Sequence, residues 1–281
     1  MTVTLLGAAE IRRLAAELDV TPTKKLGQNF VVDANTVRKI VTAADVRAGE
    51  HVVEVGPGLG SLTLAILETG ARVTAVEIDK RLAAHLPSTA AAHGVPEDAL
   101  TVITSDALRV DELPGEPTVL VANLPYNVSV PVLLHFMETF DHLQRGVVMV
   151  QSEVGERLAA APGSKIYGSP SVKAAWYGAW RLAGTVSRQV FWPVPNVDSV
   201  LVGFRRDPEP RGTEAERLAT FAIVDAAFNQ RRKMLRQALS GVLGGSAAAA
   251  SEVLERAGVD PTLRGENLTV EDYLRIARAL A

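Results

Sequence analysis

The stretch HVVEVGPGLGSLTLAIL, residues 51–67, decides the fold. Its first five residues are rich in valine, as in a buried strand, and its last seven form a run apolar enough for a buried helix. Between them stand Gly56, Gly58 and Gly60, and only residues without a Cβ let a backbone turn tightly and approach a ligand closely. The stretch therefore predicts a strand, a glycine-rich turn and a helix.

Short apolar runs alternate with helical stretches as far as residue 152. The predicted strands are RVTAVEI (72–78), LTVITSD (100–106), TVLVANLPY (118–126) and GVVMVQS (146–152). Strands separated by helices predict βαβ units and a parallel sheet. TVSRQVFW (185–192) and DSVLVGFRR (198–206) lie too close together for an intervening helix, so we predict that both are antiparallel strands closing the sheet.

Helical patterns flank this region on both sides. Residues 10–19 and 33–46 are predicted to be helical, with the polar loop TPTKKLGQNFVVD (21–33) between them. After Arg206, DPEPRGTEAE has the proline, glycine and charge of a linker, and residues 214–281 show only helical periodicity, with Thr269 as an N-cap. We therefore predict an α/β domain over residues 1–206 and a helical domain over residues 207–281.

The composition limits the classes of function. The 281 residues are 47% hydrophobic and 22% charged, as in a soluble globular protein, and contain no cysteine, which excludes disulfides, thiolate zinc sites and cysteine nucleophiles. We find neither a secretory signal nor an apolar run of about 18 residues, so we expect a cytoplasmic protein without a membrane partner. The five histidines have no metal-ligand spacing, and Walker-type and nucleophile-elbow motifs are absent from the sequence.

Two carboxylates extend the glycine turn into a predicted nucleoside site. Glu77 ends the second strand, where a carboxylate can accept hydrogen bonds from ribose hydroxyls, and Asp106 ends the third, where it suits the amine of an adenine ring. The spacing Gly-x-Gly-x-Gly favours S-adenosylmethionine over a dinucleotide, although an NAD or FAD site and plain strand-to-helix geometry remain alternatives. Glu54 either organises the turn, which we favour, or approaches the sulfonium side of the cofactor.

The sequence Asn123-Leu124-Pro125-Tyr126 ends the fourth strand. The amine of adenine is a poor nucleophile, because its lone pair is delocalised into the ring. The side-chain oxygen of Asn123 and the carbonyl of Leu124 could accept its two N–H groups, while Pro125 directs that carbonyl and Tyr126 stacks on the base. The alternative is an ordinary turn with a core aromatic residue.

A basic cluster lies in NQRRKMLRQ, residues 229–237, in a chain whose net charge is -3. Its members are Arg231, Arg232, Lys233 and Arg236, and a smaller cluster comprises Lys24 and Lys25. The overall charge does not favour a polyanionic partner, so any RNA must meet a restricted basic face. The alternative is a solvated helix face.

Six motifs together resemble one family. GQNFVVD, EVGPGLGSLT, ANLPYNVSVPVL, SKIYGSPSV, FWPVPNVDS and FNQRRKML occur in the order found in the ribosomal RNA adenine dimethyltransferases, and the match runs from about Lys24 to the C-terminus. The motifs are most similar to those of the small-subunit branch. The resemblance implies a Rossmann-like, seven-stranded S-adenosylmethionine methyltransferase domain followed by a small all-helical domain that contacts RNA.

The resemblance also implies roles for individual residues. It implies that Asn29 and Val31 close over the cofactor and that Phe191 faces Tyr126 across the target base, although a buried phenylalanine is the alternative there. Trp192 departs from the family pattern, in which a smaller residue is usual. The full predicted cofactor site is Gln28, Asn29, Val31, Gly56, Gly58, Gly60, Glu77, Ile78, Asp106, Ala107 and Asn123.

The expected activity is dimethylation of N6 on two adjacent adenines in the 3′-terminal hairpin of 16S rRNA, in the 30S subunit or its precursor, by a monomer. The target base must leave its stack to react. Three alternatives remain open: the large-subunit rRNA methyltransferases that confer macrolide resistance share most of these motifs, an assembly factor could use methylation as a release step, and DNA could be the substrate.

Overall fold

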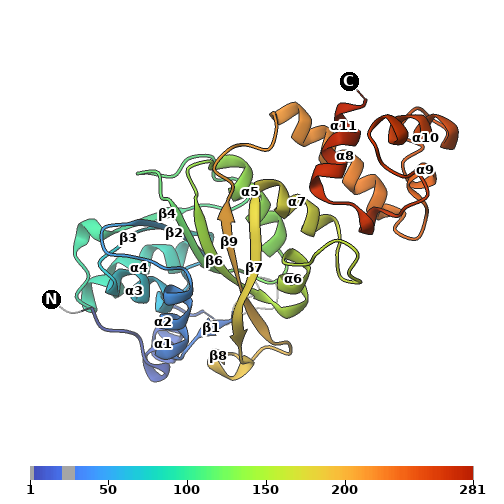
Figure 1. Cartoon of the computed structure of the whole chain (residues 1–281). Coiled ribbons are helices and arrows are strands. Elements are labelled where there is room, and N and C mark those ends of the chain that lie inside the picture. The colour runs from blue at the N-terminus through green and yellow to red at the C-terminus, as the bar shows by residue number, and fades with distance from the viewer. Residues whose placement is uncertain (1–2, 21–28, 281) are drawn as a thin grey trace. The chain divides into compact units, whose positions relative to one another are not determined.

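The computed structural model describes residues 3–20 and 29–280 (Figure 1). The chain packs as two compact units, residues 1–155 with 181–206 and residues 156–180 with 207–281. None of the described helices is long and apolar enough to span a membrane. The predicted residues Lys24, Lys25 and Gln28 lie outside the described residues.

A seven-stranded sheet in the order β4-β3-β2-β5-β6-β9-β7 forms the first unit, as predicted. Pairing is parallel from β4 through β6, and β9 is antiparallel to β6. The strands are β2 (His51–Val55), β3 (Arg72–Glu77), β4 (Leu100–Thr104), β5 (Val119–Asn123), β6 (Arg145–Gln151), β7 (Gly178–Val186) and β9 (Ser199–Arg206). The helices of this part of the chain are α1 (Ala8–Glu17), α2 (Ala34–Ala43), α3 (Ser61–Glu68), α4 (Lys80–Ala92), α5 (Ser129–Thr139) and α6 (Ser152–Leu158).

The central strands are buried on both faces. Val52, Val119 and Val147 pack with Ile40 of α2 and Ile66 of α3 in one core. The residues that follow them, Val53, Leu120 and Val148, are at most 1% exposed on the opposite face. Burial on both faces explains why these strands are continuous apolar runs in the sequence.

A separate two-stranded sheet joins β1 (Phe30–Val31) to β8 (Phe191–Trp192). The prediction of a loop across residues 21–33 missed β1, because a strand of two residues has no detectable period. The prediction that TVSRQVFW is a sheet strand was wrong for most of its length, since β7 ends at Val186 and Phe191–Trp192 pairs with Phe30–Val31 instead. The strand β7 follows a helix directly, and the only signal of the change is its first residue, Gly178, whose φ of 155° other residues rarely adopt.

The second unit is helical, as predicted for its C-terminal part. Its helices are α7 (Ser169–Tyr177), α8 (Glu214–Asn229), α9 (Leu235–Ala238), α10 (Ala247–Arg256) and α11 (Val270–Arg278), and the predicted N-cap Thr269 accepts a hydrogen bond from Asp272 N. The helical periodicity of residues 214–281 is interrupted at residues 230–234, between α8 and α9. The amides of Leu235 and Arg236 donate instead to the carbonyls of Leu263 (2.7 Å) and Pro261 (3.1 Å).

The division between the units differs from the predicted domains in one segment. The boundary after Arg206 is shared, but residues 156–180 pack with the helices of the second unit. Tyr167 contacts Phe228, and Trp176 contacts Phe221, with ring centroids 6.2 and 5.9 Å apart. These aromatic contacts are long-range in sequence, so the local patterns that defined the domains did not reveal them.

A substitution at Gly146 tests how closely the sheet is packed. A Cβ at this position would overlap the carbonyl oxygen of Leu120 and lie 2.6 Å from Phe204 Cε1. We expect Gly146→Ala to lower the free energy of unfolding by about 3 kcal/mol, as overpacking of a rigid core does. Gly241→Ala is the control, because a Cβ there meets nothing within 4 Å. Equal urea midpoints for the two variants would contradict this packing.

Candidate active site

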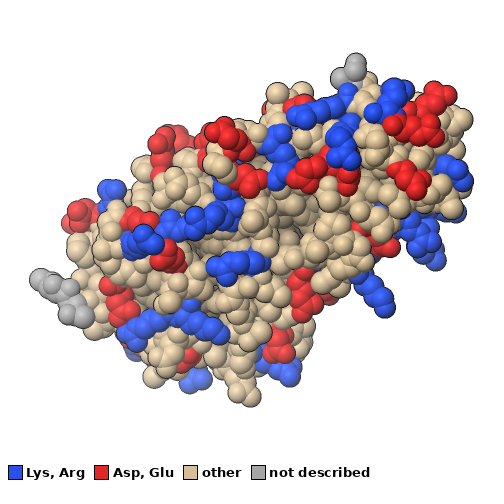
Figure 2. Space-filling model, viewed as in Figure 1, with Lys and Arg blue, Asp and Glu red and all other residues tan. Residues whose placement is uncertain are grey.

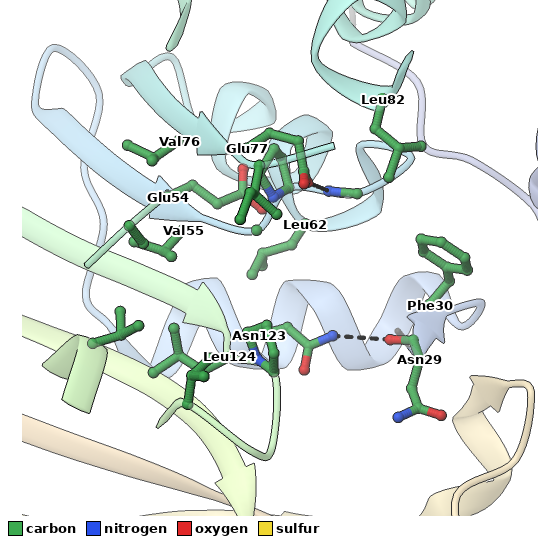
Figure 3. Close-up of a pocket in the computed structure, with 18 of the residues that line it drawn as sticks. Asn29, Phe30, Glu54, Val55, Leu62, Val76, Glu77, Leu82, Asn123 and Leu124 are labelled. Atoms are coloured by element: carbon green, nitrogen blue, oxygen red, sulfur yellow. Dashed lines mark hydrogen bonds between the residues drawn. The ribbon is translucent and has the colours of Figure 1, made fainter. Parts of the chain in front are cut away.

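A cavity opens where the predicted cofactor and reaction motifs meet (Figure 3). Its walls come from the glycine turn after β2, the ends of β3 and β5, the segment after β4 and the residues around β1. The predicted site residues that line it are Asn29, Val31, Gly56, Gly58, Glu77, Ile78, Asp106, Ala107, Asn123, Leu124, Pro125 and Tyr126. The structure thus gathers side chains that are almost one hundred residues apart in the sequence.

The glycine turn has the conformation that its sequence predicts. Gly56 and Gly58 have φ values of 70° and 59°, in the left-handed region that favours glycine. A Cβ on Gly58 would lie 3.0 Å from Phe30 Cε1, and one on Gly56 would lie 3.8 Å from the carbonyl oxygen of Asn123. The turn therefore lies against both the β1 segment and the end of β5.

Glu77 organises the glycine turn as well as facing the cavity. Its two carboxylate oxygens accept hydrogen bonds from the amides of Gly58 (3.1 Å) and Asp79 (2.9 Å). Burial raises the pKa of Glu77, because a charged carboxylate is poorly solvated there. The Asp106 carboxylate accepts a hydrogen bond from the amide of Leu108 at 3.0 Å, which holds it at the cavity edge.

Glu54 is the most strongly perturbed carboxyl group of the cavity. It is 1% exposed, and its Oε2 has no hydrogen-bond partner among the described residues. Burial, with a smaller contribution from the charge of Glu77, raises the pKa of Glu54 to about 8. An unpartnered acceptor beside a second carboxylate suits a cationic ligand, so the cavity fits the positively charged S-adenosylmethionine. This observation supports the cofactor-facing role for Glu54 beside the organising role that the sequence favoured.

The acceptor residues lie at the end of β5. Asn123 donates its side-chain N–H to the carbonyl of Asn29 at 3.1 Å, and this bond leaves its Oδ1 available as an acceptor with respect to the described residues (Figure 3). Leu124 is buried and donates its amide to Met149 at 3.1 Å, which fixes the local backbone. The hydroxyl of Tyr126 lies 2.8 Å from Ser199 Oγ, so the ring is anchored at its polar end.

Two predicted site residues are not on the cavity wall. Phe191 is 2% exposed and pairs with Val31 in the small sheet, so the structure does not bring its ring opposite Tyr126 in this cavity. Gly60 does not line the cavity either and instead caps α3 at a φ of 99°. Base stacking by Phe191 therefore stays a prediction from the resemblance.

The cavity also contains residues that the sequence did not single out. The larger apolar ones are Phe30, Leu62, Leu82, Leu108 and Val132. Phe30 could have been inferred from its position between Asn29 and Val31. The leucines lie in ordinary helical or loop patterns that give no signal of a ligand.

The members of the predicted basic cluster differ in their surroundings: Arg231 is bound within the helical unit, and the others are exposed or partly buried. Arg231 donates to Glu266 Oε2 at 2.9 Å and to the carbonyl of Lys165 at 2.6 Å, so it stabilises the helical unit. Arg232 and Lys233 are exposed, and Arg236 is partly buried. On the face shown in Figure 2 basic and acidic side chains are interspersed, so this face carries no extended field of one sign.

Comparisons with known proteins identify relatives over the whole chain. The sequence model described as "Ribosomal RNA adenine dimethylase" matches residues 21–281. The "Ribosomal RNA small subunit methyltransferase A" of Leifsonia xyli is 66% identical over 275 residues, which are 97% of this chain and 98% of that protein.

Two solved structures share the fold. The 23S rRNA methyltransferase ErmE has a TM-score of 0.67 and 26% identity, over 90% of this chain and 99% of that one. A dimethyladenosine transferase from Plasmodium falciparum has a TM-score of 0.75 over 87% of this chain and 94% of that one. Its identity of 23% makes this a likeness of fold alone.

The pKa of Glu54 predicts how cofactor binding depends on pH. Below about pH 8 the carboxyl group is protonated, and a cation must displace that proton to gain an ionised partner. We expect the affinity for S-adenosylmethionine to rise from pH 6 to pH 8 by up to about tenfold per unit, measured by calorimetry. Glu54→Gln should flatten the profile. Parallel profiles for the two proteins would contradict the assignment.

The exposed part of the basic cluster predicts a salt-dependent contact with RNA. Replacing Arg232 and Lys233 together by alanine should weaken RNA binding and lower the salt slope of the affinity by about 2, one unit for each phosphate that the protein no longer neutralises. Filter binding at several salt concentrations measures both quantities. The matched control replaces the exposed Arg12 and Arg13 of α1 by alanine. The same slope in both double variants would count against the predicted RNA contact.

Proposed function

The chain belongs to the ribosomal RNA adenine dimethylase family and is an S-adenosylmethionine-dependent rRNA adenine dimethyltransferase, and we propose that its substrate is the small-subunit rRNA. It dimethylates N6 of two adjacent adenines in the 3′-terminal hairpin of 16S rRNA, in the 30S subunit or its precursor. It acts as a cytoplasmic monomer.

The position of Asn123 beside the glycine turn is the observation that supports methyl transfer to an adenine amine. The small-subunit assignment is supported by relatives of that name at 66% and 61% identity, whereas the 23S rRNA enzyme is 26% identical. This difference favours the small subunit over the large-subunit alternative that the motifs left open.

The chain's own residues act by orientation. Asn123 Oδ1 and the carbonyl of Leu124 accept the two N–H groups of the adenine amine, which draws the nitrogen lone pair out of conjugation with the ring. The ring of Tyr126, anchored at Ser199, supports the base from one face. S-adenosylmethionine supplies the methyl group from its sulfonium.

Proton transfer needs no dedicated base in this arrangement. An alkylated amine nitrogen is acidic enough to lose its proton readily to water or to a nearby carboxylate. The singly methylated amine keeps one N–H, which either acceptor can bind, so the same residues serve the second transfer. Alignment of the amine therefore contributes more than acid or base strength.

Transfer of radiolabelled methyl groups to purified small subunits that lack adenine dimethylation tests the proposal. Label should appear in N6,N6-dimethyladenosine of 16S rRNA, and Asn123→Ala should lower kcat at least about 100-fold, as loss of an aligned acceptor does. Asn35→Ala, at an exposed position of α2, is the matched control. Label on large-subunit rRNA or DNA instead would refute the substrate assignment.

A further inference from the structure

The side chain of Asn123 is held by the main chain of a distant segment. Its amide nitrogen lies 3.1 Å from the carbonyl oxygen of Asn29, and the side chain of Asn29 points away from this bond (Figure 3). The two residues are 94 positions apart, so tertiary packing makes the contact. The contact therefore depends on how the Asn29 segment is held.

The contact selects one of the two orientations of the Asn123 amide. A carbonyl oxygen can only accept, so the NH2 half of Asn123 must face Asn29 and Oδ1 must face the other way. If the Asn123 amide were turned by 180°, its Oδ1 would face the carbonyl oxygen of Asn29, and two acceptors would oppose each other. The turned amide would also present a donor to an adenine amine that is itself a donor. The Asn29 carbonyl thus favours the orientation that the transfer needs.

Strand pairing holds the Asn29 segment. The next two residues form β1, whose Phe30 and Val31 pair with Trp192 and Phe191 of β8. The amide of Val32 extends the pairing by donating to the carbonyl of Val190 at 2.8 Å. Only a few backbone bonds hold this short strand, so side-chain contacts must add to its stability.

Trp192 provides an aromatic side-chain contact across this small sheet. Its ring stacks on Phe30 with centroids 6.3 Å apart and an interplanar angle of 24°. The Phe30 ring also lies close to Gly58, where a Cβ would be only 3.0 Å from Phe30 Cε1. Phe30 is therefore packed close to both Trp192 and the glycine turn, and it is the residue next to Asn29.

We propose that the backbone carbonyl of Asn29 is a positioning group for methyl transfer, which orients the Asn123 amide, and that Trp192 keeps it in place by stacking on Phe30. The proposal rests on the role of Asn123 in the function proposed above. Trp192 departs from the family pattern, and this proposal gives it a role: it acts on the reaction indirectly, by holding Phe30 next to Asn29. Because Phe30 and Asn29 also line the cavity, one segment both encloses the cofactor and orients the acceptor residue.

Asn123→Asp tests the donor half of the contact. Aspartate keeps an acceptor for the adenine amine, but its carboxylate faces the Asn29 carbonyl with an oxygen instead of an N–H. Protonation restores a donor, so the ratio of variant to wild-type kcat should rise by about tenfold per pH unit, up to about 100-fold, as the pH falls from 8 to 6. A ratio that does not change with pH, or an inactive variant at every pH, would overturn the role of Asn29.

Trp192→Ala and Trp192→Phe test what holds the segment. The alanine variant should exchange the Val32 amide hydrogen at least about tenfold faster and have a kcat about tenfold lower, whereas phenylalanine should keep the stack and most of both values. Faster exchange at Val32 with an unchanged kcat would overturn the proposal. A reduced kcat with Val32 still protected would also overturn it, because Trp192 would then act by another route.

Failure of the proposed function would be distinguishable from failure of this inference. If the wild-type protein transfers no methyl group to 16S rRNA, the function itself is wrong. If the wild-type protein is active and the variants at Asn123 and Trp192 depart from the expected pattern, the function stands and the positioning role falls. The exchange rate of Val32 is measured on the protein alone, so it does not depend on either activity or cofactor.

Discussion

The parallel pairing of β2 with β5 is the constraint on which the site depends. Val55 lies opposite Ala122, so Gly56, the first residue after β2, and Asn123, the last residue of β5, lie together at one edge of the sheet. The φ of 70° at Gly56, which favours glycine, lets the chain turn beside the Asn123 backbone. The cofactor motif and the acceptor motif therefore meet because two adjacent parallel strands end at the same level.

The chemistry of the cavity follows from this placement. Among the described residues that line it, the ionisable side chains are the carboxyl groups of Glu54, Glu77 and Asp106 and the phenol of Tyr126. Such a set accepts hydrogen bonds and, with Glu54 ionised, attracts a cationic cofactor, and the transfer needs no dedicated base because the alkylated amine loses its proton readily. Orientation of the adenine amine is then the main contribution of the protein. The small β1–β8 sheet contributes to it by holding Asn29, whose carbonyl orients the Asn123 amide.

Much of the fold could be predicted from the sequence, because buried parallel strands and glycine turns have strong local signals. The positions of Glu77, Asp106 and Asn123 at strand ends followed from the same signals. Contacts between distant segments could not be predicted: the pairing of Phe30 with Trp192, the packing of Tyr167 against Phe228 and the ion pair of Arg231 with Glu266 depend on tertiary proximity. The resemblance implies that Phe191 faces the target base; its side chain is 2% exposed in the structure, and its role at the base stays a prediction.

The central claim is that the cofactor's transferable group lies beside Asn123 at the shared edge of β2 and β5. A crystal structure with sinefungin, an analogue that carries an amine in place of the sulfonium methyl, tests this most directly. We expect the ribose hydroxyls at Glu77, the adenine near Asp106, and the amine directed towards Asn123 and Leu124. An analogue bound with its amine away from Asn123, or outside this cavity, would contradict it.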